Sequence, residues 1–275
     1  MAMKSEMTGN IYLDLTNEFN AGKLRAVLSS GQAVVIHGLA LASKDGDWIL
    51  REESETFEHV LKVLGKYEAR YRFGAPLDVR WMRGGWSAHF EFIYQNNRIR
   101  CDFVSRPPRL SPQDVQDLWD EQTRGEGVQK PVPTLDLRRL AEIKKTDRER
   151  DYPFIGEIAR RLPDLNQQIH LSRSARDLMA LWPQLSSEEQ RLSIAQRPLL
   201  DAVTQGRDAL ETALDKERRH LSRINEERLA RFGKASADWA AQWPVLKAEV
   251  AQLPLRASHA LLVGNAERFL PEAPL

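Results

Sequence analysis

Over residues 1–110, apolar residues occur in short blocks that alternate between strand-like and helix-like spacing. The continuous run at residues 33–36 (AVVI) predicts a buried strand, with a short helix before it over residues 18–29. Residues 52–66 have apolar positions three or four apart, acids early and a lysine late, which predicts an amphipathic helix. This part of the chain is therefore expected to form a sheet with helices packed on it.

Turn-forming residues separate the other blocks of the same region. A glycine opens the turn at residues 74–76, a Gly-Gly pair stands at residues 84–85, and a polar turn occupies residues 95–97. The blocks between these turns predict the remaining strands, which are expected at residues 47–50, 69–73, 79–82, 89–94 and 98–104.

From Ser111 onward the pattern becomes mainly helical. Ser111 and Pro112 are suited to the cap and the first turn of a helix. After a loop at residues 123–133, helices are expected at residues 134–145, 153–162, 172–182, 186–196, 198–232 and 235–253. The fold class expected is α+β, with a mixed β-sheet core and flanking helices at residues 1–132 and a mainly helical C-terminal region at residues 133–275.

Composition narrows the classes of protein. Forty Lys and Arg residues against 39 Asp and Glu give a net charge of +1, which argues against a dedicated duplex-DNA binder. Cys101 is the one cysteine, so a disulfide framework and a cysteine-built zinc site are excluded. No apolar run approaches the ~20 residues of a membrane span, and the N-terminus lacks a signal-like segment, so we expect a cytoplasmic protein without membrane contact.

Three aspartates are the strongest candidates for chemistry. Asp45 and Asp47 lie two residues apart at the start of a predicted strand, so alternation places both carboxylates on one face. Asp102 interrupts the apolar pattern of another predicted strand. If the two strands are neighbours, the three carboxylates converge, which is a donor set suited to Mg²⁺ and phosphoryl chemistry. The simpler alternative is that D-x-D is a common junction and that Asp102 faces solvent.

The order of these features resembles the polymerase-β-like nucleotidyltransferase superfamily, in particular its minimal or toxin-type bacterial members. Members carry Gly-Ser or Gly-Gly after the first strand, then D-x-D, then a third acid on a later strand. The segments VVIHGLAL and NRIRCDFVS resemble the strand-to-helix turn and the strand with the third acid. Residues 135–162 resemble the helix pair that follows the core in many bacterial members. The resemblance covers residues 25–162.

This resemblance implies an Mg²⁺-dependent nucleotidyltransferase. Such an enzyme moves a nucleoside monophosphate from a nucleoside triphosphate (NTP) to an acceptor hydroxyl and releases pyrophosphate. Asp45 and Asp47 would bind the metal, Mg²⁺ or alternatively Mn²⁺, that holds the triphosphate. Asp102 would share a second metal and help to deprotonate the acceptor. The chemistry is mainly positioning and charge neutralisation, so few residues are needed.

The resemblance also suggests which residues contact the nucleotide. The expected nucleotide-binding residues are Gly38, Ser43, Lys44, Lys144, Lys145 and Arg148. The choice between Lys144 and Lys145 stays open, and Asp151 would hold one of these cations in place. By itself, the run of charges at residues 144–151 is more commonly a solvated turn, and the resemblance makes the two explanations equally good.

Two departures from the superfamily pattern concern the turn before the D-x-D. Leu39 stands where a second small residue is expected after Gly38. Only six residues separate Gly38 from Asp45, which predicts a truncated or missing helix between them. Both departures put catalysis in doubt more than the fold.

The sequence leaves the acceptor open among RNA, protein and a small molecule. Two features favour RNA or protein: the Arg- and Trp-rich turn at residues 80–86 and the mixed-charge helix around residues 210–232. For the turn, however, a hairpin with partly buried Trp residues is the better explanation. Bacterial members include toxin components, so an antitoxin-like protein partner belongs to the expectation. The competing hypothesis is a catalytically silent module that binds nucleotide or a partner through its helices. It holds if Asp102 points away from Asp45 and Asp47.

Overall fold

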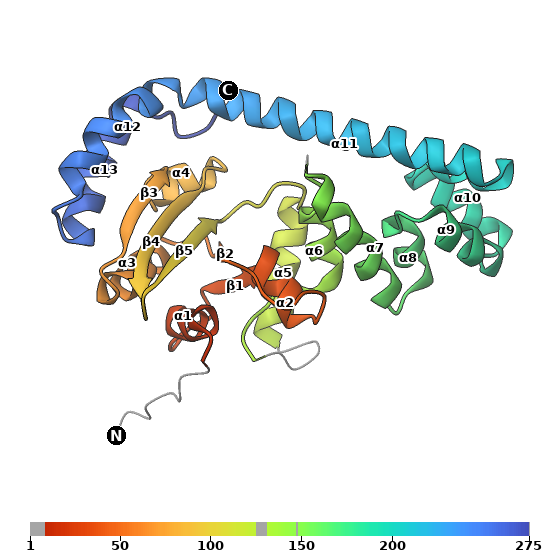
Figure 1. Ribbon diagram of the computed structural model, residues 1–275, viewed down its shortest axis with the longest axis horizontal. Coiled ribbons are helices and arrows are strands. Elements are labelled where there is room, and N and C mark those ends of the chain that lie inside the picture. Colours follow the sequence, from red (N-terminus) through yellow and green to blue (C-terminus); the bar gives the residue numbers. More distant parts are fainter. Residues whose placement is uncertain (1–8, 125–130, 147, 275) are drawn as a thin grey trace. The chain divides into compact units, whose positions relative to one another are not determined.

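The computed structural model describes residues 9–124, 131–146 and 148–274 (Figure 1). Its contacts divide the chain into two compact units. The first unit combines Met1–Leu135 with Arg231–Leu275, and the second is Asp136–Ala230. Residues 231–275, the last part of the expected C-terminal region, therefore belong to the first unit. Most of the loop expected at residues 123–133 lies outside the described residues.

A five-stranded mixed sheet organises the described part of the first unit (Figure 1). Its strands are β1 (Ala26–Ser29), β2 (Asp45–Leu50), β3 (Arg70–Gly74), β4 (Ala88–Tyr94) and β5 (Asn97–Val104), in the order β1-β2-β5-β4-β3. Strands β2 and β5 are parallel neighbours, and the other pairs are antiparallel. The α+β prediction with a mixed sheet is confirmed.

The helices of the first unit come from two parts of the sequence, one before and one after the second unit. They are α1 (Ile11–Phe19), α2 (Ser30–Ile36), α3 (Ser54–Lys66), α4 (Val79–Arg83), α5 (Pro112–Arg124), α12 (Ala237–Val250) and α13 (Leu255–Phe269). Helix α3 contacts α1 and α13, and α13 also contacts β3. Alternation along the strands sends every second side chain toward this helical layer.

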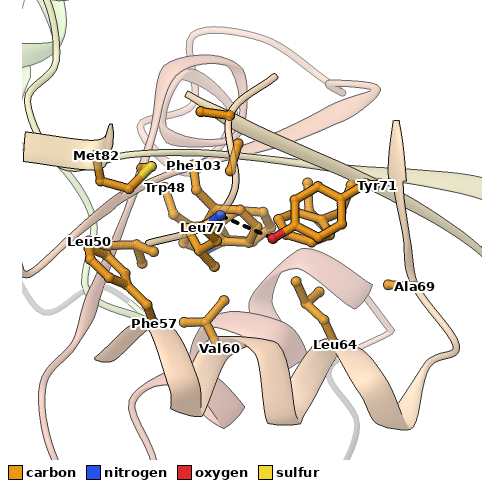
Figure 2. Close-up of a cluster of buried hydrophobic side chains, with 14 of the residues drawn as sticks. Trp48, Leu50, Phe57, Val60, Leu64, Ala69, Tyr71, Leu77, Met82 and Phe103 are labelled. Carbon is orange, nitrogen blue, oxygen red and sulfur yellow. Dashed lines mark hydrogen bonds between the residues drawn. The ribbon is translucent and has the colours of Figure 1, made fainter. Parts of the chain in front are cut away.

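Aromatic side chains fill the core between the sheet and α3 (Figure 2). Trp48 of β2 stacks on Phe103 of β5 at 5.3 Å between ring centroids, and Phe19 meets both rings edge-on. The indole nitrogen of Trp48 donates to Thr16 Oγ1 at 2.8 Å, so its one polar atom is satisfied. Cys101 is also fully buried on this side, which confirms its interpretation as a small core residue.

The second unit is helical throughout its regular elements. These are α6 (Leu137–Ile143), α7 (Tyr152–Arg161), α8 (Leu165–Leu171), α9 (Ala175–Leu181), α10 (Ser187–Gln196) and most of α11 (Arg207–Ala235), with 3-10 helices at Glu149–Asp151, Trp182–Gln184 and Pro198–Gln205. Its apolar cluster includes Ile169, Leu178, Leu200 and Leu210. Among the described helices of the chain, none has both the length and the apolar character that a membrane span requires.

Two expected strands are helices. Residues 33–36 belong to α2, and residues 79–82 belong to α4. The run in α2 follows a chain reversal at Ser30, whose φ is 49°, and the helix then packs on β1 and β2. In α4, the Asp78 side chain accepts from Arg80 N and caps the helix. Tertiary contacts and capping thus override the strand preference of these residues.

The start of the chain was also predicted incorrectly. The helix expected at residues 18–29 is replaced by the end of α1 and by β1. Helix α1 begins at Ile11 and is capped by Asn10, whose side chain accepts from Tyr12 N, and this capping signal lies well before the predicted start. Helices α8 and α13 were not expected either. The helix predicted over residues 198–232 begins as a 3-10 helix and becomes α-helical after Gly206.

Candidate active site

The face of the sheet opposite the aromatic core carries most of the polar strand residues. Because Trp48 and Phe103 point into the core, Asp47 and Asp102 beside them point to the other face. The register makes Asp47 and Asp102 direct neighbours on the parallel strands β2 and β5. Asp45 is two residues before Asp47, so it lies on the same face. The three predicted aspartates therefore share one face of two adjacent strands.

The same register extends across the whole sheet as one transverse row. From β1 to β3 the row consists of Ser29, Asp47, Asp102, His89 and Phe73. Neighbouring strands are about 4.8 Å apart, so each member of the row is within side-chain reach of the next.

Asp102 is held by two cationic or polar neighbours. His89 Nδ1 is 2.8 Å from Asp102 Oδ1, and Arg72 Nη2 is 3.0 Å from the same oxygen. Burial alone raises the pKa of Asp102, but the hydrogen bond and charge of His89, followed by Arg72, outweigh it, so this pKa lies below its usual value. Asp102 is therefore a carboxylate at neutral pH.

Asp45 has a different environment. Its nearest cationic group is Arg100 Nη1, which is 3.6 Å from Oδ1. Oδ1 itself is buried and has no hydrogen-bond partner among the described residues. Gly46, between the two aspartates, points to the core, where a β-carbon would meet the Trp48 ring and Tyr12. Glycine is thus required inside this D-G-D sequence.

A divalent cation fits this face only in part. Among the described residues, no group of three or more His, Cys, Asp or Glu is placed to hold a metal ion. At this face, Asp102 is already bonded to His89 and Arg72. Asp45 has a buried oxygen without a hydrogen-bond partner among the described residues. Mg²⁺ is commonly held by one or two carboxylates together with waters and substrate phosphates, so the chemistry of Asp45 and its neighbour Asp47 suits it.

The glycine of the expected phosphate-binding turn is not where the sequence placed it. Gly38 follows helix α2 rather than a strand, and its N–H donates to Val35 O as part of the helix end. The turn after the first strand is Ser30–Gly31. No helix lies between Gly38 and Asp45, as expected, but helix α2 precedes Gly38 and so lies between the first strand and Asp45. The positions that the resemblance assigned to Gly38 and Leu39, directly after a strand, are therefore not found.

The Ser30–Gly31 turn lies against the segment that leads into β2. A β-carbon on Gly31 would overlap Ser43 Oγ, so the two segments approach too closely for any side chain at this position. Gln32 Nε2 donates to Ser43 O at 3.0 Å, and Tyr12 Oη donates to Lys44 O at 2.6 Å. Ser43 and Lys44 are thus fixed through their backbones next to Asp45. Contact of either residue with a nucleotide stays a prediction.

Lys144, Lys145 and Arg148 belong to the second unit, and each has an acidic partner there. Lys144 Nζ is 3.4 Å from Asp151 Oδ1, and Arg148 Nη2 is 2.8 Å from Asp151 Oδ2. Asp151 does hold these cations, as the sequence suggested. Lys145 Nζ is 2.6 Å from Glu142 Oε1, and burial lowers the pKa of Lys145 despite this pairing. Nucleotide binding by the three residues also stays a prediction.

The Arg- and Trp-rich turn at residues 80–86 is structural. The indole nitrogens of Trp81 and Trp86 donate to Leu270 O at 3.0 Å and to Pro271 O at 2.9 Å. Both rings are nearly inaccessible to solvent, and Gly84 lies directly against Glu272 O. The hairpin with buried Trp residues, favoured from the sequence, is thus correct for burial, although residues 79–83 are helical.

Sequence reasoning missed several residues of this face. Ser87 and Arg72 were not singled out, and Gly31 was overlooked in favour of Gly38. The spacing Ser87-x-His89 was an available signal only if the strand predicted at residues 89–94 extended back to Ser87, because residues two apart in a strand share a face. Glu91 lies two residues beyond His89 on the same face of β4, opposite Arg100 in the register.

Comparison with known proteins gave two similar solved structures. No family model and no curated protein matches the chain. One structure is described as a "putative nucleotidyltransferase" from H. pylori; it is 10% identical, with 82% of this chain and 98% of that chain covered and a TM-score of 0.40. The other is JHP933 from Helicobacter pylori, which is 10% identical, with 81% of this chain and 94% of that chain covered and a TM-score of 0.38.

Proposed function

We propose that this protein is an Mg²⁺-dependent nucleotidyltransferase that transfers a nucleoside monophosphate from an NTP to an acceptor hydroxyl. The observation that carries the proposal is the register of β2 and β5. It makes Asp47 and Asp102 direct neighbours and leaves Asp45 on the same polar face. This is the arrangement that the D-x-D motif and the later acid were expected to form. The alternative in which Asp102 points away from the other two loses its main support.

Within this proposal, each residue of the face has a distinct task. Asp45 and Asp47 would hold the metal, which when bound supplies charge neutralisation for the triphosphate. Asp102, kept ionised by His89 and Arg72, would orient the acceptor hydroxyl and receive its proton. The close approach of Gly31 to Ser43 fixes the segment that presents Asp45. Positioning of this kind is the main contribution that a protein makes to phosphoryl transfer.

The acceptor is proposed to be RNA or protein rather than a small molecule, and a toxin with an antitoxin-like protein partner is the proposed setting. The acceptor preference rests on the mixed-charge helix, because the Trp residues of the turn at residues 80–86 are buried, and the toxin setting rests on the sequence resemblance alone. The second candidate function is a silent module that binds nucleotide without transferring it. The observation in its favour is that Asp102 is already bonded to Arg72 and His89, so it is not free to join a three-carboxylate metal group.

A thermal-stability titration tests the proposal. The purified chain is heated with ATP, GTP, CTP or UTP, each with and without Mg²⁺. A ligand that binds the folded state adds about 2.7 kcal/mol to the free energy of unfolding at a hundredfold excess over Kd, and so raises the unfolding midpoint. We expect an Mg²⁺-dependent increase for at least one NTP, which then becomes the labelled donor in transfer assays with RNA and protein acceptors.

Two variants make this test specific. Asp45→Asn with Asp47→Asn should remove the nucleotide-dependent increase while conserving side-chain shape. Glu91→Gln is the matched control, because Glu91 lies on the same face of β4 and faces Arg98 at 3.7 Å. The baseline midpoint of the double variant can rise when like charges are removed, so only the nucleotide-dependent increment counts. No increment for any NTP at millimolar concentration would contradict the proposal, and an increment without transfer to any acceptor would support the silent module.

A further inference from the structure

Ser87, His89 and Asp102 form a continuous hydrogen-bonded relay on the polar face of the sheet. Ser87 Oγ is 2.7 Å from His89 Nε2, and His89 Nδ1 is 2.8 Å from Asp102 Oδ1. Ser87 immediately precedes β4 and His89 is the second residue of that strand, and the hydrogen bond between them brings their side chains together. Asp102 is directly opposite His89 on β5.

The direction of the protons follows from Asp102. An ionised carboxylate only accepts hydrogen bonds, so His89 Nδ1 must carry a proton and donate it to Asp102. In the neutral ring, Nε2 is then the acceptor, and the hydroxyl of Ser87 donates to it. A serine that donates to a histidine oriented by a carboxylate has the geometry and the roles of a nucleophile–base–acid relay.

The surroundings of His89 hold the ring in this position. Phe73 stacks on it at 4.1 Å between centroids, with 22° between the planes. Gly74 lies beneath with a φ of 93°, and a β-carbon there would be 2.6 Å from His89 Cδ2 and 2.5 Å from Ser87 O. Arg72 bonds Asp102 and lies over the Phe73 ring at 4.6 Å. The His89–Asp102 part of the relay, on β4 and β5, is therefore fixed by three consecutive residues of β3.

We propose that Ser87 is an activated nucleophile and that this site accepts the acyl group of a carboxylic ester. Ser87 Oγ attacks the carbonyl carbon while its proton passes to His89 Nε2. The bond from that carbon to the leaving oxygen breaks, and the leaving alcohol takes the proton from His89. The product is an ester on Ser87, which water then hydrolyses with His89 again accepting the proton.

Exposure at the site matches an uncharged ester with an apolar acyl group. The Phe73 residue is 44% exposed although it is aromatic, and its ring borders His89. The His89 side chain remains 15% exposed, so the base is reachable from solvent. An apolar acyl group would cover the Phe73 ring, which gains about 25 cal/mol per Å² of buried apolar area. This inference does not depend on nucleotide transfer, because it uses no metal or NTP.

A fluorophosphonate probe tests the nucleophile directly. The probe forms an oxygen–phosphorus bond with an activated serine, and fluoride leaves as His89 takes the hydroxyl proton. The full chain is incubated with the probe and the modified peptide is located by mass spectrometry. We expect one adduct on Ser87, and we expect p-nitrophenyl acetate to release p-nitrophenol and compete with the probe. Ser111, exposed and hydrogen-bonded to Asp114 rather than to a histidine, is the internal comparison.

Variants separate activation from simple exposure. Ser87→Ala should abolish the adduct, whereas Ser111→Ala should leave it unchanged. Asp102→Asn keeps the shape but disfavours the Nδ1–H tautomer, so labelling should slow by about 100-fold or more. Unchanged thermal midpoints verify that these variants are folded. The proposal is overturned if wild-type Ser87 takes no adduct, or if Asp102→Asn and the wild type label at equal rates.

Discussion

Trp48 in the first unit and Arg197 in the second are both nearly inaccessible to solvent, yet their surroundings differ in kind. Trp48 contacts the rings of Phe19 and Phe103, and its one polar atom bonds Thr16. Arg197 donates from two of its nitrogens to Glu217, at 3.0 and 2.8 Å, and from the third to Ile169 O at 2.6 Å. Apolar contact thus stabilises the first position, and charge pairing stabilises the second.

This difference extends through the two units. The first unit has a large aromatic cluster against its sheet, whereas the second has a smaller apolar cluster and several ion pairs with little exposure. Apolar burial depends little on the state of any one neighbour, but a buried charge depends on its partner. We therefore expect mutations to act through lost volume in the first unit and through uncompensated charge in the second.

The largest effect is expected from Trp48→Ala. It removes a fully buried indole and leaves a cavity next to Phe103, so the free energy of unfolding should fall by about 3–5 kcal/mol. Hydrogen exchange followed by mass spectrometry should show faster exchange in β2 and β5. We expect the effect to stay within the first unit, and equal acceleration in α8 and α10 would contradict this expectation.

Glu217→Gln tests the charged cluster of the second unit. The Glu217 carboxylate is bonded by Arg197 and also by Arg173, so its loss leaves two cations that repel each other with little exposure. We expect a loss of about 3 kcal/mol, with faster exchange in α8 and α11.

A matched control for this charge change is Glu211→Gln. Glu211 pairs with Arg207 on the exposed surface of the same helix, so its loss should leave the free energy of unfolding nearly unchanged. If the two Glu→Gln variants were equally stable, charge pairing would not be what stabilises the second unit.

Tyr71→Phe probes one polar contact inside the apolar unit. The hydroxyl of Tyr71 accepts from Leu77 N at 3.0 Å and is 2.8 Å from His259 Nδ1 (Figure 2 shows the Leu77 contact). The substitution keeps the aromatic ring, so only the buried Leu77 N–H and the His259 side chain lose a partner. We expect urea denaturation to give a loss of about 1–2 kcal/mol. A loss as large as that of Trp48→Ala would mean that polar contacts matter more in this unit than its aromatic packing indicates.

The smallest effect is expected from acidification, and each unit has one histidine that contributes. Burial lowers the pKa of His170, helped by Arg197 and Lys145, and burial also lowers the pKa of His259 although Asp78 opposes it. The unfolded chain therefore binds these protons first as the pH falls. The stabilisation that comes from keeping these two histidines neutral is fully present above pH ~6.5. It decreases as the pH falls toward the lower pKa values of the folded state.

Urea titrations between pH 8 and pH 5 check this prediction. His170→Gln should reduce the pH dependence of exchange in the second unit alone. An unchanged dependence in that unit would show that another group takes up the proton.

How far the sequence predicted the molecule depends on the range of the contacts involved. The helix at α3 and the strands β2, β4 and β5 were predicted because their spacing is local and regular. The run at residues 33–36 was predicted as a strand because β-branched composition says nothing of the turn at Ser30 that starts α2. Asp78 was likewise a local signal for a helix start, but residues 79–82 were predicted as a strand from their apolar pattern.

The candidate site shows the same limit. Asp45 and Asp47 on one face followed from alternation, but their meeting with Asp102 required β2 and β5 to be neighbours, a pairing across a long sequence separation. The engagement of Asp102 by Arg72 and His89 depends on the order of three strands. No periodicity in a single sequence encodes that order. The metal and nucleotide roles of these residues stay predictions.

The burial of Cys101 gives this chain a built-in reporter of sheet opening. Its thiol faces the aromatic core and is fully buried, and burial raises its pKa well above the ordinary value. A thiol reagent can therefore reach it only when β5 separates from the helices beneath it. Because the chain has no second cysteine, the rate of alkylation of the unmodified protein measures how often β5 opens at Cys101, the residue next to Asp102.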